Sequence, residues 1–468
     1  MSIKRRALTL RGFCRWLRAT ELFADAPTVE VVIHAARART PRSDLVVFSQ
    51  RLALRLPARQ ISPMGKLEPP RDDSAAPHKM TDDHERVIEE IRLLFREDLD
   101  QHVSDWEHER GVPAWVFERL GAIGAFRARW PNRGRQPGRI DVAATIAREA
   151  SLISVGAAIA ISTHTEAYFS SLARSKYGER TWHDALAGRA IGALAISESG
   201  GGSHPTAHCE TRAERASSGW VLHGHKQYVS NMRAATDIVV FAQTGRARGV
   251  SGFSFFIVPK EARGITVITH QLTASAASAT AMLELDRVEV PDERRVGSVG
   301  SGVFILLELL CAERLAAACG ALAMAELCFE IALAYADRRL IDGVPLRQRQ
   351  AVGHKLASLA TEIAAGRALV AERLLAAHAG RLAAAEACQA KLMLSRVAWR
   401  AADDAVQMLG GLALLEQTPL ARIWRDVRVA RIGGGTDEVH REIISRSLRS
   451  GELRDHPAVL AAAREARA

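Results

Sequence analysis

Hydrophobic side chains along this chain follow a helical period first, then a strand period, and then a helical period again. Between Val87 and Leu186 they recur largely at spacings of three and four residues, which predicts α-helices. From Ile191 the apolar runs become short and are separated by Gly, Asn, Asp and Pro, which is typical of β-strands. After Gly302, long stretches rich in Ala, Leu and Arg return to the helical period.

The short apolar runs predict strands over Ile191–Ile196, Trp220–Leu222, Ile238–Ala242, Phe253–Val258, Ile265–Ile268 and Met282–Val290. Glycines and prolines divide the last part into helices over Val303–Leu340, Leu346–Ala379, Leu382–Leu409 and Thr436–Leu448. These patterns predict an α+β fold with an N-terminal α-helical domain, a middle antiparallel β-domain and a C-terminal four-helix bundle.

We expect the helical domain at residues 80–190, the β-domain at 191–300, the bundle at 301–455 and a tail at 456–468. Residues 1–79 show no clear period and hold 15 Lys and Arg against 7 Asp and Glu, which is most of the net charge of +10. We interpret them as a disordered extension or as a start site assigned too far upstream of Met80. Because Lys4 to Arg18 is rich in Arg and poor in acids, a targeting peptide is the alternative.

Composition excludes several classes of function. The chain after residue 79 is close to neutral, which gives no support for nucleic-acid binding. No apolar run reaches the roughly 18 residues that a membrane span needs. The six cysteines have no metal-ligand spacing, which favours reduced core residues in a cytosolic protein and predicts no metal site. Neither a GxGxxG after a strand nor a P-loop motif is present.

Two segments of the predicted β-domain combine glycine, hydroxyl and aromatic side chains. They are Ser197-Glu198-Ser199-Gly200-Gly201-Gly202-Ser203-His204 and Gly224-His225-Lys226-Gln227-Tyr228-Val229-Ser230-Asn231. Glycines let the backbone approach a ring or a pyrophosphate, hydroxyls supply donors, and an aromatic ring can stack. Taken alone, each segment also fits an ordinary Gly-rich turn or a half-buried strand.

Three further segments lie in the predicted bundle: Arg338-Arg339-Leu340-Ile341-Asp342-Gly343 with Gln350 after it, Gln407-Met408-Leu409-Gly410-Gly411, and Gly433-Gly434-Gly435-Thr436-Asp437-Glu438. Together with the two β-domain segments they resemble the acyl-CoA dehydrogenase family over roughly Thr81 to Leu453, and most of all its isovaleryl-CoA and long-chain branch. Ser199, His204, Asp342 and Leu412 depart from the family pattern.

The resemblance implies a bound FAD and assigns contacts to it. These would come from Ser197, Ser203, Tyr228, Ser230, Arg339, Gln350, Gln407, Gly410, Gly411, Thr436 and Glu438. In the family, the positions of Arg339, Gln350 and the Gln407–Gly411 segment reach the cofactor of a neighbouring subunit, which implies a homotetramer or homodimer. The resemblance further implies substrate contacts from Ser203, Arg314 and Gly435.

The catalytic base is the open question of this resemblance. Many family members carry a glutamate directly before the Gly-Thr pair, where this chain has Gly434. Branched-chain and long-chain members carry their base on a bundle helix, where this chain reads Glu313-Arg314-Leu315. Burial among apolar neighbours would raise the pKa of Glu313 toward the neutral range that a base needs. The alternative is a surface pair of Glu313 with Arg314.

The resemblance therefore implies FAD-dependent α,β-dehydrogenation of an acyl-CoA thioester to the 2,3-enoyl-CoA. Glu313 would remove the α-proton, and the Gly434 backbone N–H would bind the thioester carbonyl. Electrons would pass to an electron-transfer flavoprotein. The alternatives are the same reaction on a carrier-protein-bound acyl group, a flavin monooxygenase on the same fold, and a non-catalytic flavin-binding relic.

Overall fold

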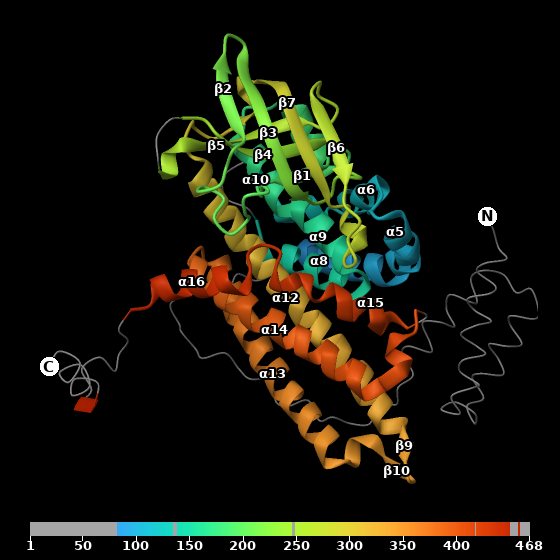
Figure 1. Cartoon of the computed structure of the whole chain (residues 1–468). Coiled ribbons are helices and arrows are strands. Elements are labelled where there is room, and N and C mark those ends of the chain that lie inside the picture. The colour runs from blue at the N-terminus through green and yellow to red at the C-terminus, as the bar shows by residue number, and fades with distance from the viewer. Residues whose placement is uncertain (1–81, 134–137, 246–248, 417, 450–456, 459–468) are drawn as a thin grey trace, which may run out of the picture. The chain divides into compact units, whose positions relative to one another are not determined.

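The computed structural model describes residues 82–133, 138–245, 249–416, 418–449 and 457–458. The prediction for residues 1–79 lies outside these residues, as does nearly all of the predicted tail. The described residues divide into two compact units, of which the smaller is 336–346. The larger unit begins with helices, continues with a sheet and ends with helices, which confirms the predicted fold class (Figure 1).

Helices fill the larger unit from residue 82 to residue 186. They are α4 Asp82–Leu93, η1 Leu94–Leu99, η2 Asp100–His102, α5 Val103–Glu109, α6 Ala114–Ala122, α7 Ala125–Arg129, α8 Ile140–Ile153, α9 Val155–Ser162, η3 Thr163–Tyr168, α10 Phe169–Arg174 and α11 Glu179–Leu186. Their apolar stripes meet in one core, because side chains three and four residues apart share a helix face.

The π-helix η3 is buried along its whole length and brings an acidic residue into the interior. Glu166 lies against Arg129, whose Nε and Nη2 atoms donate to its carboxylate oxygens at 2.9 Å and 2.7 Å. Both side chains are buried, so neither charge is compensated by water. Removal of one partner would leave the other charge alone in the core.

The middle of the chain forms one eight-stranded sheet in the order β6-β7-β3-β2-β4-β5-β8, with β1 beside β4. The strands are β1 Gly192–Ala195, β2 Arg212–Ala216, β3 Gly219–Val229, β4 Asp237–Gln243, β5 Phe253–Pro259, β6 Ile265–Thr269, β7 Ala281–Pro291 and β8 Arg295–Val296; the turns η4 Val250–Gly252, η5 Ala276–Ser278 and η6 Asp292–Arg294 connect some of them. Both faces of β4 and β5 are buried: Phe241 and Phe255 join the helical core, and Val240 and Phe256 join a second core within the sheet.

The sheet is mixed, which corrects the prediction of an antiparallel β-domain. β1 pairs with β4 in parallel, with Gly192 opposite Asp237 and Ala195 opposite Val240. The β2–β3 hairpin lies between β1 and β4 in the sequence, so the chain crosses back before β4 runs alongside β1. Strand β2 escaped prediction because only Ala213 of its five residues is buried, which leaves no apolar run.

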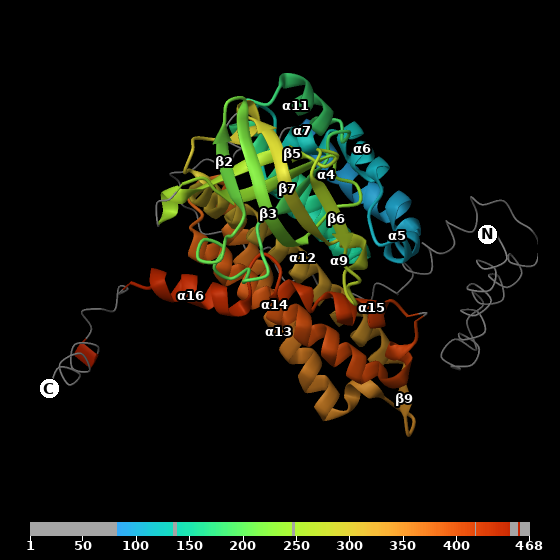
Figure 2. The same ribbon diagram turned by 45° about the horizontal axis from the view of Figure 1, so that its top comes forward.

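Helices return after the sheet and form the bundle (Figure 2). They are α12 Gly302–Arg338, α13 Gln350–His378, α14 Ala384–Leu409, α15 Pro419–Asp426 and α16 Asp437–Ser447, with the turns η7 Leu346–Gln348, η8 Gly410–Leu414 and η9 Val429–Arg431. Helix α14 packs against both α13 and α16. The first turns of α12 pack against the sheet, because Ile305 and Leu306 share a core with Phe253 and Phe255 of β5.

The smaller unit is a tight hairpin in which β9 Leu340–Ile341 pairs with β10 Val344–Pro345. Asp342 and Gly343 connect the strands with φ of 53° and 74°. Two positive φ values are typical of a type I′ turn, which favours Asp-Gly. The turn gives a local reason for Asp342, and it explains why the flanking helices are shorter than predicted.

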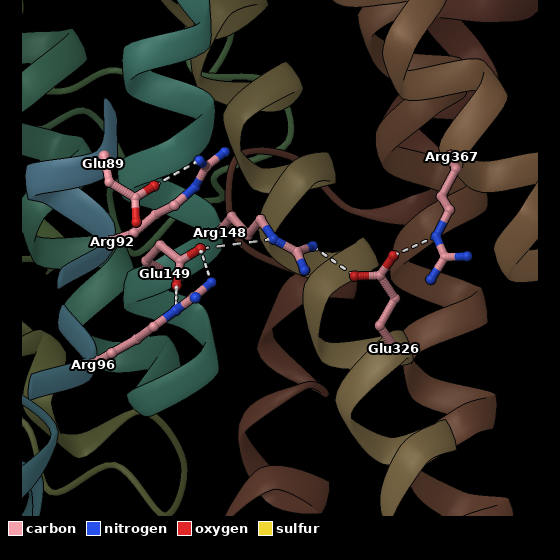
Figure 3. Close-up of polar contacts among 7 residues, drawn as sticks. All are labelled: Glu89, Arg92, Arg96, Arg148, Glu149, Glu326 and Arg367. Carbon is pink, nitrogen blue, oxygen red and sulfur yellow. Dashed lines mark hydrogen bonds and ion pairs between the residues drawn. The ribbon is translucent and has the colours of Figure 1, made fainter. Parts of the chain in front are cut away.

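A chain of ion pairs joins the N-terminal helices to the bundle (Figure 3). Glu149 of α8 is buried and accepts from Arg96 Nε at 3.0 Å. The preceding Arg148 donates from Nη1 to Glu326 Oε2 of α12 at 2.6 Å. Glu326 Oε1 also accepts from Arg367 Nε of α13 at 2.7 Å. Glu326 thus links the three helices α8, α12 and α13.

Among the described residues, none of the helices is both long and apolar enough to cross a bilayer. The same residues contain no group of three or more His, Cys, Asp or Glu side chains that could hold a metal ion. Five cysteines lie in the described part, and all are free thiols: Cys209, Cys311, Cys319, Cys328 and Cys388. The last three are buried.

Candidate active site

The structure brings the two alternative base positions together. Glu313 is half-buried on α12, and Gly434 lies in the loop between η9 and α16. A Cβ built on Gly434 would lie 3.6 Å from Glu313 Oε1. A side chain at position 434 would therefore begin in contact with the Glu313 carboxylate, so the two base positions are neighbours in space.

Arg314 is 3% exposed, so Glu313 and Arg314 are not the exposed surface pair considered as an alternative. Its Nε donates to the Gly434 carbonyl at 3.1 Å. Arg314 was predicted to contact the substrate, and the contact that the structure gives it is to the loop. This carbonyl belongs to the peptide that directly follows the candidate Gly434 N–H, so the cation anchors the loop beside that donor.

The loop backbone favours glycine at both predicted positions. Gly434 and Gly435 have φ of 66° and 113°, which side chains rarely adopt. A Cβ on Gly435 would also lie 3.0 Å from His440 Nε2, whereas the space beside Gly434 is open to ordinary contacts. Thr436 ends the loop as the N-cap of α16, where its hydroxyl accepts from the Val439 N–H at 3.3 Å.

Lys391 of α14 completes this group and was missed by the sequence analysis. It is 2% exposed, and its Nζ donates to the carbonyls of Ala430 and Gly435, each at 3.0 Å. Its Cε would lie 3.6 Å from a Cβ on Gly434. Helical spacing carried a signal, because Ala387, Lys391, Leu394 and Ala398 form one stripe: a lysine on that stripe has to be buried.

The charges around Glu313 oppose one another. Burial raises the pKa of the Glu313 carboxyl, while Arg314 and Lys391 lower it and Glu166 of η3 raises it further. The net direction is upward, as a base for proton abstraction requires. Burial lowers the pKa of Lys391 to about 8, and the Glu313 carboxylate opposes that effect.

A second group gathers at the ends of β1 and β3. The Gln227 N–H donates to the Ser197 carbonyl at 2.8 Å, and Leu194 forms an isolated bridge with Ser230. Ser197 and Ser230 are half-buried, whereas Tyr228 is 65% exposed at a φ of 57° and its ring lies 5.5 Å from that of His270. An exposed aromatic ring and nearby strand-end hydroxyls are the groups that stacking on a flavin and binding its polar edge require.

A buried ion pair fastens this second group. Lys226 Nζ donates to Glu198 Oε1 at 2.5 Å, and Glu198 also accepts from the N–H groups of Glu210 and Thr211. Burial opposes the charge of Glu198, but Lys226 and the hydrogen bonds lower its pKa overall. The neighbouring Ser199, a departure from the family pattern, forms a 2.9 Å hydrogen bond with His225 Nε2.

The remaining predicted FAD contacts are exposed: Ser203, Arg339, Gln350, Gln407, Gly410, Gly411 and Glu438. Arg339 belongs to the smaller unit, directly before β9. A Cβ on Gly410 or Gly411 would meet nothing within 4 Å. Glu438 pairs with Arg441 at 3.3 Å. The roles of these residues toward FAD stay predictions.

Family models and known proteins match this arrangement. The chain matches the N-terminal, middle and C-terminal domains of acyl-CoA dehydrogenase over residues 81–181, 193–288 and 300–449. It is 30% identical to the long-chain specific acyl-CoA dehydrogenase of Sus scrofa, covering 88% of this chain and 98% of that protein. It is 29% identical to the human short-chain specific enzyme, covering 79% of this chain and 91% of that one.

Solved structures give the same result. The acyl-CoA dehydrogenase of Geobacillus kaustophilus superposes with a TM-score of 0.74 at 27% identity, covering 80% of this chain and all of that one. The chain therefore belongs to the acyl-CoA dehydrogenase family, and it is an FAD-dependent oxidoreductase that acts on the CH–CH group of its substrate.

Proposed function

We propose that this chain dehydrogenates an acyl-CoA thioester between C2 and C3 with Glu313 as the catalytic base. The observation that carries the proposal is the 3.6 Å between Glu313 Oε1 and the Cβ position of Gly434. A carboxylate in contact with the usual base position can take the same proton. The raised pKa of Glu313 supports this role, because a base works best when its pKa is near the working pH.

The loop supplies the complementary half of the chemistry. The Gly434 N–H would donate to the thioester carbonyl as negative charge develops there, which lowers the barrier to proton removal. Arg314 and Lys391 bind the carbonyls of Gly434, Ala430 and Gly435, so contacts within the chain hold the loop in place. FAD, when bound by residues such as Ser197, Tyr228 and Ser230, supplies the acceptor for the β-hydride.

We further propose that the protein is a homotetramer or homodimer and passes its electrons to an electron-transfer flavoprotein. Large apolar side chains stand exposed beside the open Gly410–Gly411 turn, among them Leu414 at 65%. Leu375 of α13 is also exposed, at 66%. Such surfaces are covered in oligomers. Sedimentation of a flavin-loaded monomer would contradict this part.

Anaerobic flavin reduction tests the function. The purified protein is mixed with straight-chain and branched acyl-CoAs of increasing length, and with acyl groups on a carrier protein. We expect the flavin absorbance to bleach with a subset of the acyl-CoAs and a 2,3-enoyl product to form. Bleaching by carrier-bound acyl groups alone would show that the substrate is an acyl group on a carrier protein. Binding of FAD without bleaching by any thioester would contradict the proposal and favour a relic or a monooxygenase.

A further inference from the structure

Lys391 is the most deeply buried cation beside the candidate base. Its side chain is 2% exposed on the inner stripe of α14. Its two hydrogen bonds go to backbone carbonyls, at Ala430 and Gly435. Burial of an ammonium group costs free energy unless partners or a function offset it, and neutral carbonyls offset only part of that cost.

The positions of these two carbonyls are informative, because they flank Gly434. Ala430 lies in η9, four residues before Gly434, and Gly435 directly follows Gly434 and ends the glycine run. Arg314 holds the carbonyl between them, that of Gly434. A run of glycines has large backbone freedom, so without such contacts the Gly434 N–H would have no fixed direction.

The charges that face Glu313 and Lys391 come from several elements. Arg314 lies on α12, Cys388 on α14, Glu166 on η3, and Asp437 and His440 on α16. Of these, Glu166 is paired with Arg129, and Asp437 is paired with Arg431 at 2.6 Å. Burial lowers the pKa of His440 to about 4, so this imidazole is neutral near pH 7. Lys391 and Arg314 are then the cations that act on the Glu313 carboxylate.

We propose that Lys391 is a positioning residue of this active site. It holds the segment from Ala430 to Gly435 so that the Gly434 N–H and the Glu313 carboxylate are positioned for the same substrate. Its charge also keeps that carboxylate ionised. Lys391 can exert both effects because it lies close to both groups: a Cβ on Gly434 would lie 3.6 Å from Glu313 Oε1 and 3.6 Å from Lys391 Cε. This inference rests on the proposed function of Glu313 as base.

The test compares Lys391→Met, which removes the charge and the donors, with Lys391→Arg, which keeps both. The first measurement is the rate of anaerobic flavin reduction by the best acyl-CoA as a function of pH. We expect Lys391→Met to slow reduction roughly 10- to 100-fold, because the loop donor is misplaced. Glu313 accepts a proton only when ionised, and loss of a cation raises its pKa. The acidic limb should therefore move to higher pH by about one pH unit.

The second measurement is amide hydrogen exchange of the peptide over residues 428–437 in the FAD-loaded protein. We expect Lys391→Met to speed exchange there about 10-fold or more, since the loop loses two of its anchors. Lys391→Arg should restore most of the protection and the wild-type acidic limb. Lys355→Met is the matched control, because Lys355 is a half-exposed lysine on α13 that pairs with Asp404. It should change neither measurement.

A Lys391→Met protein with the exchange and the acidic limb of the wild type would overturn the proposal. Should this variant not fold, Lys391→Gln removes the charge with a smaller change in polarity and is judged by the same two measurements. A wild type that no acyl-CoA reduces would contradict the proposed function instead. In that case, the exchange measurement still decides whether Lys391 holds the loop.

Discussion

The two halves of the candidate active site differ in how much of their structure the chain itself provides. Around Glu313, the loop carbonyls of Ala430, Gly434 and Gly435 are bound by buried cations. At the ends of β1 and β3, Tyr228 is 65% exposed and its ring lies beside that of His270. In the proposed mechanism, the proton-transfer half around Glu313 is thus held by contacts within the chain, whereas the flavin half around Tyr228 offers a more exposed side chain.

This difference predicts where a mutation acts. Changes in the proton-transfer half should alter rate or fold stability and spare cofactor binding. Changes in the flavin half should weaken cofactor binding and spare the fold. The predictions that follow test this division, starting with the largest expected effect.

The sharpest test of the proton-transfer half is Glu313→Gln, which keeps the shape of the side chain but cannot accept a proton. We expect flavin reduction to slow by about 10²–10⁴-fold with FAD content unchanged. Glu308→Gln is the control, because Glu308 lies on the same helix, is exposed and pairs with Arg174. Stopped-flow absorbance measures both variants. Reduction at the wild-type rate in Glu313→Gln would show that the base lies elsewhere or that the reaction needs none.

The buried pair of Arg129 and Glu166 should govern stability rather than cofactor binding. Glu166→Gln leaves the buried Arg129 charge without its partner, and such a loss typically costs about 3–5 kcal/mol. We expect a clear fall in the free energy of unfolding, measured in denaturant. Glu90→Gln, at the exposed pair with Arg86, should change it by less than about 1 kcal/mol. Equal effects of the two variants would refute the assignment.

A double variant tests whether a carboxylate at position 434 can replace Glu313 as the base for the same substrate. Glu313→Ala with Gly434→Glu moves the carboxylate to the loop, where a Cβ has room. We expect part of the rate that Glu313→Ala alone loses to return. The recovery should be incomplete, since a glutamate at a φ of 66° costs roughly 1–2 kcal/mol. A double variant no faster than Glu313→Ala, yet folded and loaded with FAD, would place the two positions at different points.

Tyr228→Ala probes the flavin half. We expect the dissociation constant for FAD to rise about 10-fold, which matches the roughly 0.5–1.5 kcal/mol of one aromatic contact. Thermal stability of the apoprotein should not change, because the ring is 65% exposed. Tyr228→Phe keeps the ring and should bind like the wild type. Fluorescence titration of the apoprotein gives these constants, and equal affinity in all three proteins would remove Tyr228 from the site.

The smallest effect should come from Glu326→Gln, which lies in neither half. Glu326 accepts from Arg148 and Arg367 at 2.6 Å and 2.7 Å, but the side chains of these arginines are 40% and 63% exposed (Figure 3). We expect a loss of about 1 kcal/mol or less that shrinks with added salt. Chemical denaturation at low and high salt measures it. A larger loss that salt leaves unchanged would mean that the network is more shielded than these exposures indicate.

The features that depend on local sequence pattern could be predicted from the sequence. The order of helix, strand and helix follows from apolar spacing, and the pairing of Glu313 with the vacant Gly434 followed from two motifs about 120 residues apart. Helix ends were wrong where a hairpin intervened, because the Asp342-Gly343 turn is short and both flanks are apolar. Local pattern thus indicated the candidate base but not its surroundings.

The features that sequence reasoning missed are non-local contacts. The parallel pairing of β1 with β4 depends on a crossover that no apolar period records. The stripe on α14 shows that Lys391 has to be buried, but its partners are backbone carbonyls 39 and 44 residues away, which any sequence could supply. Glu198 and Lys226 both belong to the two glycine-containing segments of the β-domain. They form a buried ion pair only because β1 and β3 fold against each other.

The closeness of Glu313 and Gly434 also has an evolutionary consequence. A lineage that exchanges one base for the other by single substitutions must pass through a protein with two carboxylates or with none. Two carboxylates at this distance would repel each other until one took up a proton, and the glutamate at 434 would also sit on left-handed backbone. In the proposed mechanism, an exchange of the base between Glu313 and position 434 therefore passes through one of these two intermediates unless both residues change together.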